Sequence, residues 1–169
     1  VHMALVDAPA IEVAPTDADI VWLFDLRSGV GMYPNDAMHC SILVDGPYLY
    51  LNTCNAVDNT HKVIRSPDAP SLIVMEKTTG RLVAQDAEHI GPQIFHSTWS
   101  SPAMGEVNGK KLVFFCGGDG MCYAFDALDV SKVPESVQSL NRVWRFDIDP
   151  TAPKENIHEH LSDLHGSPS

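Results

Sequence analysis

Three short segments of this chain share one arrangement and follow one another at intervals of about sixty residues. Two of them contain tryptophan, Val-Trp-Leu-Phe-Asp around Trp22 and Val-Trp-Arg-Phe-Asp around Trp144. Between them lies Val-Ala-Gln-Asp, in which Ala84 takes the place of the tryptophan. A repeat of this length indicates that each period forms one supersecondary unit, which buries its apolar surface against its neighbours.

Within each period, turn signals separate short apolar runs. Asn108-Gly109 is the dipeptide that type I′ hairpin turns prefer, because both central residues need a positive φ. Gly117 to Gly120 marks a second turn, and Asp45-Gly46-Pro47 marks a turn in the preceding period. Four strands are therefore expected in each of two periods: 41–44, 48–53, 71–76 and 81–86, then 101–107, 111–116, 121–126 and 142–148.

Four antiparallel strands repeated around an axis form the blades of a β-propeller. We therefore expect an all-β chain that is one partial β-propeller domain over residues 1–169, with about two complete blades and two partial ones. The complete blades would occupy 40–86 and 99–148, 1–26 would end a preceding blade, and 149–169 would lead into a next blade. The two tryptophans would fill the wedge between neighbouring sheets, where an aromatic side chain buries roughly 150–250 Å².

The ordered motifs resemble the PQQ-like β-propeller repeat of the quinoprotein alcohol dehydrogenase-like family. They are Lys-Thr-Thr-Gly-Arg-Leu-Val at 77–83, Ser-Ser-Pro-Ala at 100–103, Gly-Gly-Asp-Gly-Met-Cys-Tyr-Ala-Phe-Asp at 117–126 and Val-Trp-Arg-Phe-Asp at 143–147. The resemblance covers about residues 20–150, and the family includes non-catalytic relatives of the outer-membrane assembly type. It implies the fold more strongly than an activity, because one fold hosts many functions.

The connections between strands place most distinctive polar residues at one end of the expected blades. In an up-and-down meander, the connections 27–39, 55–70 and 87–98 emerge at the same end. An insertion as long as 55–70, without secondary structure of its own, is usually functional or mobile. We expect this long-loop face to bind a ligand or partner, through His39, Asn55, Asp58, Asn59, His61, Arg65, His89, His96 and Asp119.

The sequence also predicts one more strand and one short helix. Residues 19–26 are expected to form a strand, because Trp22 and Phe24 alternate with a polar residue and fall in the repeat frame. The connection 127–141 emerges at the opposite end of the blades. Within it, 130–140 is expected to form a short helix that caps the second blade, because Ser131 and Pro134 lie near its start.

The polar residues of the long-loop face could bind a metal ion or stabilise turns. Its four histidines lack the H-x-x-x-H and C-x-x-C spacings of zinc sites, so we interpret them as scattered loop residues. Asn55, Asp58 and Asp119 offer the oxygen ligands that Ca²⁺ prefers. Asn and Asp also stabilise turns by bonding their own backbone, and this is the interpretation that we favour.

The four cysteines fall into two pairs. Cys40 and Cys54 flank one hairpin and should lie near each other. A disulfide between them suits an exported protein, while buried free thiols suit the packing role of cysteine and are favoured. Cys116 and Cys122 flank the turn at 117–120 and should point to opposite faces in a simple register.

The net charge of −11 argues against nucleic-acid binding, which needs clustered Lys and Arg. No stretch approaches the roughly 20 apolar residues of a membrane span, and no signal peptide is visible. The favoured function is a non-catalytic binding module without a cofactor, exported to the periplasm or cell surface. Its partner would be a protein or a carbohydrate. The remaining blades, or further copies of the chain, would complete the circle of blades of the propeller.

The resemblance also implies an alternative, a fragment of a quinoprotein dehydrogenase that holds PQQ and Ca²⁺ in the axial channel. The enzymes of this family typically carry an adjacent Cys-Cys pair and a tryptophan that sandwich the cofactor. This chain contains no Cys-Cys dipeptide, and no catalytic residue is assigned. The departure favours the binding module over the oxidoreductase.

Overall fold

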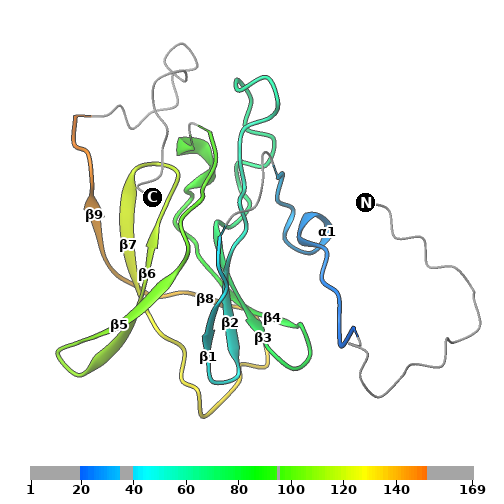
Figure 1. The fold of residues 1–169 in the computed structure, drawn as a ribbon, viewed down its shortest axis with the longest axis vertical. Coiled ribbons are helices and arrows are strands. Elements are labelled where there is room, and N and C mark those ends of the chain that lie inside the picture. The colour runs from blue at the N-terminus through cyan, green and yellow to red at the C-terminus, as the bar shows by residue number, and fades with distance from the viewer. Residues whose placement is uncertain (1–19, 35–39, 95, 152–169) are drawn as a thin grey trace, which may run out of the picture.

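Two β-sheets form most of the regular structure of this protein, shown by a computed structural model that describes residues 20–34, 40–94 and 96–151 (Figure 1). The strand order is β1-β2-β3-β4-β8 in the first sheet and β5-β6-β7-β9 in the second. The strands are β1 Leu43–Asp45, β2 Tyr48–Asn52, β3 Leu72–Glu76, β4 Leu82–Gln85, β5 Ala103–Val107, β6 Lys110–Cys116, β7 Met121–Asp126, β8 Gln138–Ser139 and β9 Arg142–Asp147. The described part of the chain is therefore mostly β, which confirms the expected all-β character.

Each sheet contains the four-stranded antiparallel meander that the turn signals predicted. All eight predicted strands form, and their ends lie within two residues of the predicted ones. The β5–β6 turn uses positive φ at Asn108 (53°) and Gly109 (75°), as a type I′ turn requires. In the β1–β2 turn, Gly46 also has a positive φ, of 54°.

The two sheets share one hydrophobic core. Tyr48 and Tyr50 enter it from β2, Phe115 from β6, and Tyr123 and Phe125 from β7, all fully or almost fully buried. The rings of Tyr123 and Phe125 stack with centroids 6.1 Å apart. Aromatic side chains dominate this core because each removes a large area from water, so the two sheets stabilise each other.

The connection 127–141 crosses from the second sheet to the first, and the predicted helix at 130–140 is wrong. Its end forms β8, which pairs in parallel with β4, and the Leu140 amide donates to the Gln85 carbonyl over 2.8 Å. Near its start, the Asp129 carboxylate accepts from the Ser131 amide (2.9 Å) and hydroxyl (2.7 Å), which forms a local turn. Sheet pairing and turn bonds are therefore formed in place of the predicted helix.

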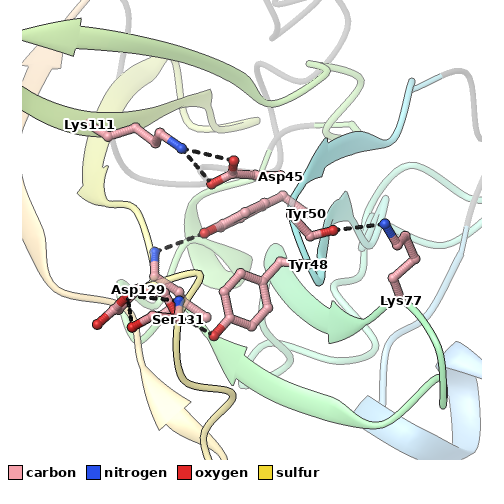
Figure 2. Close-up of polar contacts among 9 residues, drawn as sticks. Asp45, Tyr48, Tyr50, Lys77, Lys111, Asp129 and Ser131 are labelled. Atoms are coloured by element: carbon pink, nitrogen blue, oxygen red, sulfur yellow. Dashed lines mark hydrogen bonds and ion pairs between the residues drawn. The ribbon is translucent and has the colours of Figure 1, made fainter.

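Tyrosine hydroxyls of β2 hold this connection in place, as Figure 2 shows. Tyr48 donates to the carbonyl oxygens of Asp129 (2.8 Å) and Lys132 (3.0 Å). The Tyr50 hydroxyl accepts from the Leu128 amide over 2.9 Å. Both rings lie in the core while their hydroxyls reach backbone groups, so the crossing segment is tied to the first sheet.

The segment before the first sheet does not form the strand predicted at 19–26. Residues 20–25 have no regular structure, and Asp25 begins helix α1, Leu26–Val30, by accepting the Arg27 amide at 3.0 Å. The expected strand is replaced because Asp is a strong helix N-cap. Trp22 nevertheless contacts the first sheet: its indole N–H donates to the Lys77 carbonyl over 2.9 Å.

Candidate binding face

The three connections of the long-loop face meet at one end of the sheets (Figure 1). The Ala56 amide donates to the Tyr33 carbonyl (3.1 Å), which joins 55–70 to the described part of 27–39. The Val57 amide donates to the His96 carbonyl (3.0 Å), which joins it to 87–98. A Cβ on Gly91 would lie only 2.2 Å from the Pro67 carbonyl oxygen, so glycine allows a close backbone approach there. The predicted convergence of these connections is observed.

Asn55 supports the long-loop face from the interior of the protein. Its side chain is fully buried, its Oδ1 accepts the Tyr33 amide at 3.0 Å, and its Nδ2 donates to the Ser66 carbonyl at 2.7 Å. One amide side chain therefore satisfies backbone groups of two connections. The role of Asn55 is structural, since a buried polar group without a hydrogen-bond partner would lower the stability of the fold.

Asp58 organises the tip of the 55–70 connection. Its carboxylate accepts from the Thr60 hydroxyl (2.6 Å) and from Arg65 Nη2 (2.9 Å). The Thr60 hydroxyl, followed by Arg65, lowers the pKa of Asp58 to about 2, against the opposing effect of burial. Asn59 is exposed, and the Arg65 side chain remains 57% exposed, so both are accessible at the surface.

Three rings line up at the surface of the face, and we call them the ring cluster. The centroids of His61 and His96 lie 4.6 Å apart, and those of His96 and Trp99 lie 5.0 Å apart. His61 is exposed and has a positive φ of 57°, whereas His96 and Trp99 are half-buried. Both histidines were expected on this face, whereas Trp99 was not, and its only signal in the sequence is its position three residues after His96.

The neighbouring β6–β7 turn packs beneath the face. The Gly118 amide donates to the Thr98 hydroxyl at 3.1 Å. Asp119 is buried, and its carboxylate accepts the Met121 amide at 3.2 Å and the Tyr123 hydroxyl. Burial, followed by the charge of Asp119, raises the pKa of Tyr123 well above its usual range, so this hydroxyl remains a donor.

The two remaining histidine candidates are His39 and His89. His39 lies outside the described residues. His89 is exposed, with a φ of 53°, at the start of the 87–98 connection. It follows Asp86, whose buried carboxylate accepts the amides of Ser71 and Leu72, each at 2.7 Å.

The residues considered for calcium act as hydrogen-bond acceptors in this structure. The Asn55 oxygen and the carboxylates of Asp58 and Asp119 each accept hydrogen bonds from neighbouring amides or hydroxyls. Across 20–34, 40–94 and 96–151, no three His, Cys, Asp or Glu side chains are grouped to share a metal ion. These oxygens organise turns, and no chemical step is assigned to a bound metal.

Both cysteine pairs are brought together. The Sγ atoms of Cys40 and Cys54 lie 3.4 Å apart as free thiols. Cys116 and Cys122 are direct register partners on β6 and β7, so they point to the same face and the predicted opposite orientation is wrong. The turn keeps its expected bounds, but Cys116 pairs with Cys122 rather than with Met121, and the Gly117 amide donates to the Met121 carbonyl at 2.9 Å.

In the part of the chain that the structure describes, no helix is long and apolar enough to cross a membrane. The long-loop face presents the ring cluster and the exposed Arg65. No protein-family model matches this chain, and no curated protein matches it.

Proposed function

We propose that this chain is part of a PQQ-like β-propeller and acts as a non-catalytic binding module. In this proposal the protein is exported to the periplasm or cell surface, and the long-loop face contacts a protein or carbohydrate partner. The ring cluster carries the proposal, because it presents aromatic side chains on a face whose connections are joined by hydrogen bonds. Aromatic side chains and Arg are enriched at the centres of binding interfaces.

The propeller proposal is supported by the tryptophans of the repeat. A Cβ on Gly80 would lie 2.5 Å from the Trp22 ring, so the indole lies directly on the β3–β4 turn of the first sheet. Trp144, its counterpart on β9, is 40% exposed and contacts Phe114 at a centroid distance of 5.9 Å. In this proposal the Trp22 contact is the wedge between consecutive units, and Trp144 would make the same contact with a following unit.

The outer face of the second sheet supports the need for further units. Val143, Phe146 and Ile148, on and just after β9, are 43%, 64% and 38% exposed. Exposed apolar side chains of this kind favour contact with another unit. Further four-stranded units or additional copies of the chain would cover this face and close the ring.

The partner proposal is tested by measuring binding to a panel of polysaccharides and, separately, by photo-crosslinking to exported proteins of the source organism. We expect one arm to give saturable binding, and replacement of 55–70 by a short turn to abolish it. His61→Ala should weaken the same binding about tenfold, because it removes the outer ring of the cluster. Val130→Ala, an exposed change on the connection 127–141, is the control and should bind like the wild type.

Two outcomes contradict this proposal. Binding that survives replacement of 55–70 places the site elsewhere. Dye-linked oxidation of alcohols or sugars after addition of PQQ and Ca²⁺ to the folded chain shows catalysis, which the module does not perform. Circular dichroism of each variant confirms that the sheets remain folded.

A further inference from the structure

We propose that Cys40 and Cys54 form a reactive dithiol that low-molecular-weight disulfides convert into an intramolecular disulfide. Their Sγ atoms are 3.4 Å apart, at the two open ends of the β1–β2 hairpin. An S–S bond is ~2 Å long, so closure needs a shift of little more than one ångström. This inference concerns covalent chemistry and does not depend on the proposed partner binding.

The backbone of Cys54 is held in an uncommon conformation that keeps its thiol beside Cys40. Its φ is 54°, in the left-handed region that non-glycine residues rarely adopt. The Cys54 amide donates to Asn52 Oδ1 at 2.7 Å, and Asn52 Nδ2 donates in turn to the Thr98 carbonyl at 2.8 Å. Such strain persists only where the surroundings enforce it, and here the 87–98 connection enforces it through Asn52.

Cys40 is positioned from the second sheet as well. The amide of the next residue, Ser41, donates to the Ser101 hydroxyl at 2.8 Å. The Cys40 thiol itself contacts the Asn52 carbonyl oxygen at 3.6 Å. Residues that precede β5 therefore hold both sulfur atoms in register.

The two thiols differ in burial and in pKa, and these differences make Cys40 the nucleophile. Cys40 is half-buried, and the hydrogen bond from the Cys54 thiol lowers its pKa to about 7. Cys54 is fully buried, and donating this bond raises its own pKa. Thiolate is the reactive form of cysteine, so Cys40 reacts first with an external disulfide.

The reaction is a two-step thiol–disulfide exchange. Cys40 thiolate attacks one sulfur of a small disulfide such as glutathione disulfide, forms a mixed disulfide and releases one glutathione thiolate. Cys54 then loses its proton and attacks the Cys40 sulfur, which releases the second glutathione. The protein loses two electrons and two protons, and the glutathione disulfide is reduced to two thiols.

The second cysteine pair provides an internal comparison. Cys116 and Cys122 also face each other, across β6 and β7. Burial and the neighbouring Cys116 raise the pKa of Cys122 to about 11, so this thiol stays protonated at neutral pH. We therefore expect the Cys40–Cys54 bond to form first.

Glutathione disulfide is the probe, and intact mass with peptide mapping is the readout. In a Cys116→Ser/Cys122→Ser background, the folded chain should lose two hydrogen atoms and retain no glutathione. Adding Cys54→Ser should leave one glutathione trapped on Cys40, because the resolving thiol is gone. Adding Cys40→Ser instead should leave Cys54 unmodified until the protein is unfolded with urea.

Peptide mapping of oxidised wild-type protein gives an answer even if a variant fails to fold. A disulfide between Cys40 and Cys54 supports the proposal. Four unmodified thiols after exposure of the folded protein to glutathione disulfide overturn it, and so does earlier formation of the Cys116–Cys122 bond. Oxidation should also slow amide hydrogen exchange at Ala56 and Val57 about threefold or more, since the bond fixes the start of the 55–70 connection.

Discussion

At the scale of single residues, the long-loop face depends on polar side chains that serve the backbone. Asn55 and Asp58 are both buried in the 55–70 connection, and each bonds groups from more than one position. Buried polar groups of this kind contribute little net stability when paired and cost much when their partners are removed. The exposed residues that remain for binding, His61 and Arg65, lie immediately beside them.

Replacement of Asn55 tests this dependence. Asn55→Ala leaves the Tyr33 amide and the Ser66 carbonyl without their side-chain partner, and we expect the free energy of unfolding to fall by about 2 kcal/mol. Urea denaturation measures the change. Asn59→Ala, an exposed substitution of the same type in the same connection, should change stability by less than about 0.5 kcal/mol. Equal effects of the two substitutions would contradict the anchoring role.

Asp58 should make stability depend on pH. Because its pKa is lowered to about 2 in the folded protein, from a usual value near 3.8, its ionised form stabilises the fold. This contribution is complete above about pH 4 and is lost as the pH falls toward about 2. Asp58→Asn should flatten the decrease in urea midpoint over this window, and Asp68→Asn controls for the loss of one charge from the same connection. An unchanged slope in the Asp58 variant would refute the linkage.

At the scale of elements, short connections bring distant strands into contact. The β3–β4 turn is the clearest example, because Gly80 has a φ of 70° and lies against the Trp22 ring. Left-handed backbone and lack of a Cβ are both needed there. The turn therefore joins the segment before α1 to the first sheet.

Alanine substitutions separate these two requirements. Gly31 has nearly the same φ, 71°, but a Cβ there would meet nothing within 4 Å. We expect Gly31→Ala to cost about 1–2 kcal/mol for the backbone conformation alone. Gly80→Ala should cost at least about 1 kcal/mol more, because it also displaces the indole. Thermal unfolding of both variants gives the comparison, and equal losses would show that Trp22 does not pack there.

The eight strands were predictable because turns and apolar runs are local signals. Asn108-Gly109 predicted one hairpin correctly, whereas the glycine pattern of the β6–β7 turn did not reveal that Cys116 pairs with Cys122, so the orientation expected for these two cysteines was wrong. The helix predicted at 130–140 failed because its backbone partner, Gln85, lies far away in the sequence. The ring cluster was only partly predictable, since the approach of Trp99 to the histidines depends on how two connections meet.

At the scale of the whole molecule, each sheet packs against the other through the shared core. The shared core buries aromatic residues of β2, β6 and β7, while β9 exposes Trp144 and Phe146. An exposed apolar sheet face favours association in water. Residues of β9 therefore form one candidate surface for association.

Solution mass tests this property. Phe146 is 64% exposed, so Phe146→Glu removes apolar surface and adds a charge without disturbing the core. We expect the wild-type chain to associate increasingly with concentration in sedimentation experiments. The variant should need a protein concentration at least about tenfold higher to reach the same degree of association. Val107→Glu, on the opposite edge strand β5, should behave like the wild type. Identical behaviour of the two variants would show that β9 is not the contact.

The parallel pairing of β8 with β4 has a consequence for how such a chain changes over evolution. Repeat proteins commonly lengthen or shorten by gain or loss of whole units, because each unit is nearly self-contained. Here the second unit supplies a strand to the edge of the first, through Gln138 and Ser139. Deletion of the second unit would remove that strand and leave β4 at the edge of its sheet. We therefore expect gain or loss of whole units to be less frequent at this junction than in repeat proteins whose units share no strand.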